Sequence, residues 1–249
     1  MLSTRTRPNP SLPPQTPSTV PGQSSRTALC IWLPTFELRL ELMRFPALDA
    51  TSVALLGTGV GTRLTVWQVS ERAAEAGVRP GQLVSQAISL CPTLTLLESD
   101  PAHYDAAQDT LLEVLAELTP VVEPAGHGRI FLGMDGLARL YGSPHNQVLR
   151  VLRSLSRVLP AALVAATRAG LAPGKFGAWV AAAGAQPGDP TIVPEGTLRT
   201  FLASRPVSVL PVEGATLDRL ERLGVRTLGE LVRFPAPALV GQFGEEGGR

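Results

Sequence analysis

The sequence predicts an α+β fold: a ferredoxin-like core with a small insertion, followed by an all-helical segment. Three observations predict it. Short apolar runs of strand type alternate with two long amphipathic helical patterns between residues 28 and 167. A hairpin and short helices interrupt this order between Pro46 and Pro92, and only helical patterns follow a Pro- and Gly-rich linker at residues 184–194. Two helices packed on one sheet are the ferredoxin-like arrangement.

The first element of this core follows a tail. Residues 1–26 are rich in Pro, Ser and Thr and contain no apolar segment of the secretory type, so we expect a disordered tail. Residues 28–33 form an apolar run that predicts a strand, and Pro34 ends it. Residues 35–44 then predict a short amphipathic helix.

The insertion begins with two expected strands, at residues 51–57 and 63–69. The turn GTGVGT between them lacks the GK[ST] ending of a phosphate loop and leads into a strand, so it favours a hairpin. Ser70 is placed to cap a short helix, and a second short helix precedes Pro92.

The rest of the core and the C-terminal segment follow the same logic. Asp100 and Pro101 occupy the N-cap and first position of a long helix, and residues 144–159 predict a second. The remaining expected strands are residues 93–99, 121–123, 129–133 and 161–167. The remaining expected helices are residues 174–183, 195–202, 215–223, 227–234 and 237 onward.

Charge is unevenly distributed along a chain whose net charge is only +1. Residues 27–149 contain 7 basic and 13 acidic residues, whereas residues 150–249 contain 12 basic and 8 acidic residues. A nucleic-acid-binding surface would therefore lie in the second half. The alternative is a solvated arginine-rich surface.

Cysteine and histidine usage argues against a metal or disulfide scaffold. Cys30 and Cys91 lie far apart in apolar runs, as expected of reduced, buried thiols in a cytoplasmic bacterial protein. His103, His127 and His145 lack the spacing of zinc ligands. We expect no cofactor and no membrane-spanning segment.

Three stretches together resemble the Y-family DNA polymerases (UmuC-type), and most closely their ImuB-like branch, the polymerase-like accessory factors of inducible (SOS) mutagenesis. They are AAEAGVRPGQLVSQAISLCPTLTLLESDPAHY (73–104), GLAPGKFGAW (170–179) and VSVLPVEGATLDRLERLGVRTLGEL (207–231). The resemblance implies a palm, a fingers insertion and a helical thumb, with the chain ending before the family's little-finger domain. The implied palm is residues 27–44 and 93–168, the fingers are residues 45–92, and the palm-to-thumb helix, linker and incomplete thumb are residues 169–249.

The resemblance also implies where catalytic carboxylates would stand. Active members carry Asp-Met-Asp at the end of the first strand and Asp-Glu on the paired strands, and these residues hold two magnesium ions. Here Trp32, Leu33 and Pro34 occupy the first place, and Gly128 and Arg129 the second. We therefore expect no catalytic residue, no metal and no enzyme activity. An active translesion polymerase with unusual metal ligands is one alternative, and a truncated product without independent function is another.

The implied nucleotide grip is also depleted. Glu71 and Ala74 replace its Tyr and Arg, and Lys175 matches the lysine that completes it, with a DNA phosphate as the alternative ligand. The other acidic residues near these motifs are expected to be solvated or to cap turns: Glu37, Glu41, Glu123 and Asp135. Trp32 is expected to pack at the strand end.

The function implied is a non-catalytic adaptor in DNA-damage tolerance. The stretch LERLGVRTLGELVRF has the pattern of a helix–hairpin–helix. In DNA-binding hairpins of this kind the backbone amides contact phosphate oxygens. The candidate DNA-binding residues are Arg168, Lys175, Arg219, Arg222, Gly224 and Arg226, with weak backbone binding expected because Pro211, Val212 and Glu213 replace a family Gly-Ile-Gly hairpin. Expected protein partners are an error-prone polymerase, a RecA-like accessory protein and the sliding clamp, although the C-terminal region expected to bind them is absent.

Overall fold

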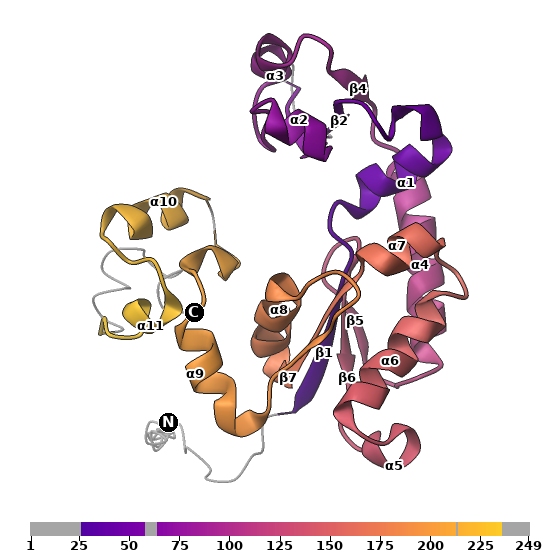
Figure 1. The fold of residues 1–249 in the computed structure, drawn as a ribbon, viewed down its shortest axis with the longest axis vertical. Coiled ribbons are helices and arrows are strands. Elements are labelled where there is room, and N and C mark those ends of the chain that lie inside the picture. The colour runs from indigo at the N-terminus through magenta and orange to yellow at the C-terminus, as the bar shows by residue number, and fades with distance from the viewer. Residues whose placement is uncertain (1–25, 58–63, 213, 236–249) are drawn as a thin grey trace, which may run out of the picture.

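The computed structural model describes residues 26–57, 64–212 and 214–235. A five-stranded sheet with helices on both faces forms the core, a smaller sheet forms the insertion, and short helices follow (Figure 1). The expected tail, most of the GTGVGT turn, Glu213 and the helix expected from Pro237 lie outside the described residues. No helix in the described ranges is both long and apolar enough to cross a bilayer.

The core sheet has the strand order β5-β6-β1-β7-β8. Its strands are β1 (Thr27–Trp32), β5 (Val122–Pro124), β6 (Arg129–Gly133), β7 (Arg168–Pro173) and β8 (Thr191–Ile192). β1 pairs antiparallel with both β6 and β7, and β8 is added parallel to β7. The four strands β5, β6, β1 and β7 lie in the ferredoxin-like order, so the predicted fold class is confirmed.

Helices cover both faces of this sheet. α4 (Pro101–Ala116) and α6 (Pro144–Leu155) lie on one side and α8 (Gly174–Gly184) on the other (Figure 1). Alternation along β1 explains the two layers, because Leu29 and Ile31 join the core under α4 and α6 while Cys30 and Trp32 join the alanine-rich cluster under α8.

Close packing of α8 on β7 depends on Gly170. A Cβ built there would lie 2.1 Å from the backbone nitrogen of Ala182, in the last turn of α8. Only glycine therefore permits this approach of helix to strand.

The insertion leaves the core after β1 through α1 (Phe36–Arg44) and a short 3-10 turn, η1 (Pro46–Leu48). Its sheet has the order β3-β2-β4, and its helices are α2 and α3. The bounds are β2 (Val53–Leu56), β3 (Val66–Val69), β4 (Thr95–Leu97), α2 (Glu71–Glu75) and α3 (Val84–Leu90). A separate small core fills it, as expected of an independent packing unit.

The C-terminal segment is built from short helices around a core of Val207, Leu220, Val225 and Leu228. Its elements are η2 (Glu195–Thr197), α9 (Leu198–Ala203), η3 (Val207–Val209), α10 (Gly214–Arg222) and α11 (Leu228–Leu231). In the described part of this segment the predicted all-helical character is confirmed.

Some expected elements differ from the structure. The strand expected at residues 161–167 is a helix, α7 (Ala161–Ala166), because its alanines favour helix and Pro160 stands at its start. The last core strand is instead β7, directly after it. A further short helix, α5 (Ala138–Tyr141), had no prediction, and α6 ends at Leu155, earlier than expected.

Candidate functional site

The carboxyl end of β1 brings together residues from three strands. Trp32, the last residue of β1, is the register partner of Arg129 at the start of β6 and of Arg168 at the start of β7. Two arginines therefore flank one tryptophan across the sheet. This end of β1 leads through α1 towards the insertion (Figure 1).

These side chains form a compact group that we call the strand-end cluster: Trp32, Arg129, Arg168 and Trp179. The Trp32 and Trp179 rings meet edge to face, with centroids 5.1 Å apart. The guanidinium of Arg129 lies 4.7 Å from the ring centroid of Trp179, and that of Arg168 lies 5.4 Å from that of Trp32. Cation–π contacts of this kind stabilise a guanidinium at a half-buried position.

Trp179 also joins the core to the C-terminal helices. Its indole Nε1 donates a hydrogen bond of 2.9 Å to the backbone carbonyl of Val209 in η3. The expectation that Trp32 packs at the strand end agrees with this cluster, and Trp179 is a member that the sequence did not indicate.

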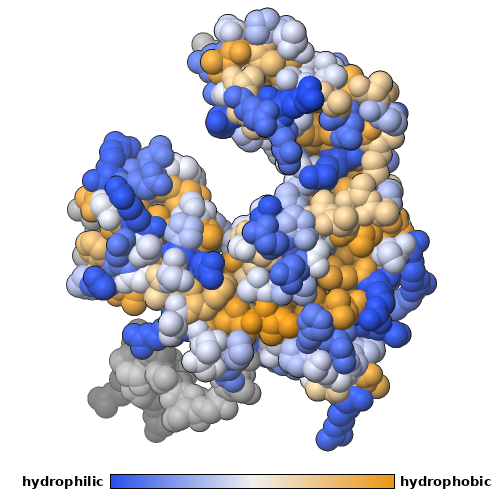
Figure 2. Space-filling model, viewed as in Figure 1, coloured by the Kyte–Doolittle hydropathy of each residue, from blue (hydrophilic) through white to orange (hydrophobic). Residues whose placement is uncertain are grey.

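A pocket of about 450 Å³ opens beside the cluster, between core and insertion. We call it the strand-end pocket. Trp32, Glu37, His127 and Arg129 line it from the core, and Trp67 and Gln68 line it from β3. On a larger scale, Figure 2 shows the molecule hollowed between the insertion and the C-terminal helices.

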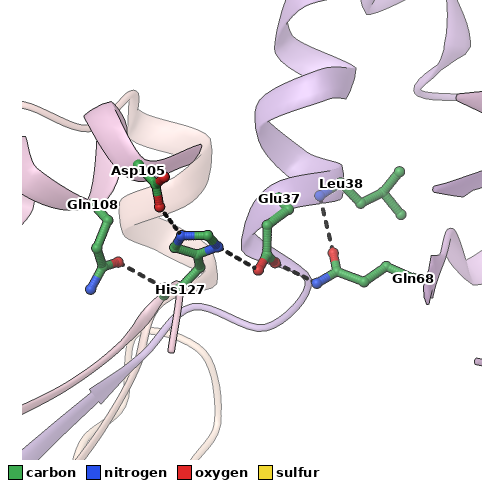
Figure 3. A network of polar contacts seen from close by, with 7 residues as sticks. Glu37, Leu38, Gln68, Asp105, Gln108 and His127 are labelled. Carbon is green, nitrogen blue, oxygen red and sulfur yellow. Dashed lines mark hydrogen bonds and ion pairs between the residues drawn. The ribbon is translucent and has the colours of Figure 1, made fainter. Parts of the chain in front are cut away.

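A polar network underlies this pocket (Figure 3). His127 Nδ1 lies 3.2 Å from a carboxylate oxygen of Glu37, and its Nε2 lies 2.9 Å from one of Asp105. The His127 ring thus lies between a carboxylate of α1 and a carboxylate of α4. Gln68 donates to Glu37 and accepts from the backbone nitrogen of Leu38 at 3.0 Å, which ties the insertion to α1.

The expected solvated roles of two acids are wrong. Glu37 and Glu41 are only 5% and 3% exposed, because both lie on the buried face of α1. Glu37 is held by His127 and Gln68, and Glu41 by Arg44 at 3.3 Å. Asp135 accepts from the backbone nitrogen of Thr27 at 2.9 Å, a capping role as expected.

The residues at the strand ends do not fit the magnesium ions that the family implies. Trp32, Pro34 and Arg129 offer no carboxylate oxygen. Gly128 has a φ of +68°, and a Cβ there would lie 2.6 Å from the Cβ of Phe36, so no acidic side chain has room at this position. In the described ranges no three His, Cys, Asp or Glu side chains gather as a metal site would require.

Lys175 lies at the other end of the sheet. It follows Pro173, the register partner of Thr27, whereas Trp32 lies at the opposite end of β1. Its Nζ forms an ion pair with the Glu123 carboxylate. This placement argues against binding of a nucleotide by Lys175 in the strand-end pocket. The ion pair gives Glu123 a partner that the sequence did not predict.

The hairpin between α10 and α11 has the predicted form, with Gly224 at φ +79°. Its backbone amides are all engaged, however. The nitrogens of Leu223, Gly224 and Val225 donate to carbonyls of α10, and those of Arg226 and Thr227 donate to the Glu230 carboxylate at 2.7 and 3.0 Å. The amide contacts expected of a helix–hairpin–helix are therefore occupied within the protein.

Arginine side chains remain accessible on this hairpin. Arg219, Arg222 and Arg226 are exposed, and the last two line one pocket with Ser208, Asp218 and Glu221. Arg168, by contrast, is half-buried in the strand-end cluster. The six candidate DNA-binding residues thus divide into a hairpin group, a strand-end residue and the distant Lys175.

Sequence reasoning missed the polar network around His127. Its members stand 31 and 90 residues from Glu37 along the chain. No spacing rule connects them, and only the βαββαβ topology with its insertion brings them together. The one usable signal was a glutamate, Glu37, three residues after the strand-ending Pro34.

The fold built from these elements is that of the Y-family DNA polymerases. DinB from Sulfolobus solfataricus matches 88% of the chain with a TM-score of 0.74 at 18% identity, and the match covers 63% of that chain. The chain belongs to the impB/mucB/samB family, whose model matches residues 31–183. This match places the chain in a family of DNA-damage tolerance proteins.

Curated relatives extend this likeness. DNA polymerase IV 2 of Mesorhizobium japonicum is 31% identical over 91% of the chain and 52% of the relative, and DNA polymerase IV of Yersinia pseudotuberculosis is 31% identical over 69% of the chain and 48% of the relative. The chain thus spans about half the length of the curated relatives it matches.

These relatives correct one prediction. We expected from the strand ends that the chain is not an enzyme, and this is wrong, because proteins that match most of its length are named DNA polymerase IV. The prediction rested on a few positions at two strand ends, whereas the family match extends over residues 31–183.

Proposed function

We propose that this chain forms the palm, fingers and part of the thumb of a translesion-type protein, and that it holds duplex DNA through the phosphate backbone. In this proposal the palm is residues 27–44 and 93–168, the fingers are residues 45–92, and the thumb with its linking helix is residues 169–249. The structure differs from this division at β4 (Thr95–Leu97), which pairs with β2 in the sheet of the insertion. The family and its fold support this division.

The exposed arginines of the thumb hairpin are the observation that carries the proposal. Arg222 and Arg226 project from the two sides of the Gly224 turn into one pocket. Guanidinium groups bind phosphate oxygens well, since their planar donors match the anion. Because Glu230 already accepts from the hairpin amides, contact with DNA falls to side chains alone.

Binding of this kind should be weak and sensitive to salt. Asp218 and Glu221 line the same pocket and reduce its positive potential. Phosphate contacts release counterions, and the logarithm of the binding constant falls with the logarithm of salt by about 0.9 for each phosphate neutralised on duplex DNA. Arg168 and Lys175 are further proposed contacts, the latter only when it leaves Glu123.

Fluorescence anisotropy with labelled primer–template duplex tests this. Arg222→Ala with Arg226→Ala should lower affinity and reduce the salt slope by about 1.8, which corresponds to two phosphates. The matched control is Arg139→Ala with Arg153→Ala, two exposed arginines on α5 and α6. Unchanged affinity of the hairpin variant at low salt would exclude the hairpin as the DNA contact.

DNA synthesis is a second candidate function, and the relatives named DNA polymerase IV favour it. A carboxylate of the strand-end pocket, Glu37, would then be needed, although His127 and Gln68 engage it in this structure. Primer extension by the purified protein, lost in Glu37→Gln with duplex binding retained, would support this candidate. No extension by the wild type would reject it.

The resemblance supports two finer proposals. The chain would belong to the ImuB-like branch of the family. It would then assemble in the bacterial cytoplasm with an error-prone polymerase, a RecA-like accessory protein and the sliding clamp. Co-purification of the chain with each separately expressed partner tests these contacts, and failure with all three would reject the assembly role.

A further inference from the structure

We propose that α10 is a contact between two copies of this chain, in which the charged face of one α10 packs antiparallel against the same face of the other. The contact is symmetric, so Asp218 of each copy pairs with Arg222 of the other. The proposal does not rest on duplex binding by the hairpin, although both contacts would use Arg222.

The outer face of α10 is open and carries both signs of charge. The helix is anchored to the C-terminal segment through Leu220, which packs in one core with Val207. Helical spacing places Asp218, Glu221 and Arg222 on the opposite face, and all three are exposed. α10 lies at the outer side of the C-terminal helices, away from the core sheet (Figure 1). This face is therefore accessible to a partner.

The charges on this face do not neutralise one another within the chain. Asp218 and Arg222 are one turn apart, the spacing at which an acid and a base commonly pair on a helix. Arg222 instead donates from Nε to the backbone carbonyl of Asp218 at 3.2 Å. Among the described residues these two side chains have no ion-pair partner, and neither do Glu221 and Arg226. Their ion-pairing capacity remains available to a second molecule.

Two-fold symmetry makes a second copy the partner that fits this pattern. In an antiparallel helix pair whose two-fold axis passes midway between positions 218 and 222, each of these positions lies opposite the other. Asp218 and Arg222 therefore meet twice. The exposed Gly214 and Ala215 lie on the same face and let the two helices approach closely. A polyanion such as duplex DNA complements only the arginines, whereas a second copy complements the acids as well.

A hollow of about 730 Å³ beside α10 leaves room for side chains of the other copy. Pro206, Val207 and Ser208 line it, together with Arg226 and the three charged residues of the α10 face. Exposed ion pairs each contribute little to binding and are screened by salt. We therefore expect a weak dimer that dissociates as the ionic strength rises.

Sedimentation velocity of the full chain without DNA tests this, in a concentration series that reaches the millimolar range at low salt. The wild type should show a monomer–dimer equilibrium. Arg222→Glu and Asp218→Arg should each raise the dissociation constant about tenfold, because like charges then face each other across the axis. An equimolar mixture of the two variants should associate more tightly than either alone, because every contact between the helices again joins opposite charges.

The matched control is Arg139→Glu, the same change of charge at an exposed position of α5, which should dimerise like the wild type. Circular dichroism confirms that each variant is folded. A wild type that stays monomeric throughout the series overturns the proposal, and so does a mixture that associates no more tightly than the separate variants. Duplex binding by the hairpin is decided independently, by fluorescence anisotropy at concentrations where the chain is monomeric.

Discussion

Replacing Trp179 by phenylalanine should loosen the attachment of the C-terminal helices to the core. Phenylalanine retains an aromatic face for Arg129 and Trp32 but has no N–H for the Val209 carbonyl. The lost hydrogen bond costs about 1 kcal/mol. The weaker cation–π contact of phenylalanine adds about 0.5 kcal/mol, so the expected total is about 1.5 kcal/mol.

Urea denaturation followed by circular dichroism measures this loss, and hydrogen exchange locates it. Amides of residues 198–231 should exchange faster in Trp179→Phe while those of β1 and β6 remain protected. Trp67→Phe is the matched control, because Trp67 is 37% exposed and packs on the insertion side. If both variants lose the same stability and exchange alike, Trp179 does not anchor the C-terminal helices and the reasoning fails.

Three further predictions concern the fold and its polar network. Gly170→Ala should cost about 3 kcal/mol or more because its Cβ would strike the backbone of α8, whereas Gly196→Ala, with open space around it, should be tolerated; thermal denaturation compares them. His127→Ala should cost about 2 kcal/mol in urea denaturation, since the buried Glu37 carboxylate loses a hydrogen-bond partner, and an unchanged midpoint would contradict this. The amides of the hairpin hold the pKa of Glu230 below its ordinary value of 4.5. The stability that Glu230 contributes is therefore complete above pH 4.5 and is lost as the pH falls through the lowered pKa. Hydrogen exchange of the hairpin amides, measured against pH, should show this loss in the wild type and not in Glu230→Gln.

Most of the fold could be predicted because its signals are local. The apolar run closed by Pro34 predicted β1, and Asp100 and Ser70 form the predicted caps at the starts of α4 and α2. The exception is the strand expected at residues 161–167: residues 161–166 are all apolar, and periodicity alone does not separate a strand from a helix in so short a run. The high alanine content of this segment favours the helix that the structure shows.

The site could be predicted only in part because its contacts are not local. The absence of carboxylates at Trp32 and Gly128 was readable in the sequence. The burial of Glu37, its partners in the insertion and on α4, and the stacking of Arg129 on Trp179 depend on tertiary packing between distant segments. Hairpin form was predicted from Gly224, but the occupation of its amides by Glu230 was not.

The residues at the end of β1 pack against one another, so a substitution of one of them affects the others. Gly128 leaves no room for a side chain because Phe36 packs against it, so a carboxylate there requires a rearranged α1. Arg129 is fixed by Trp179, which in turn contacts Trp32 and the C-terminal helices. A single acidic substitution would break this cluster without assembling a set of oxygen ligands. The end of β1 is therefore a packed cluster of two arginines and two tryptophans whose parts depend on one another.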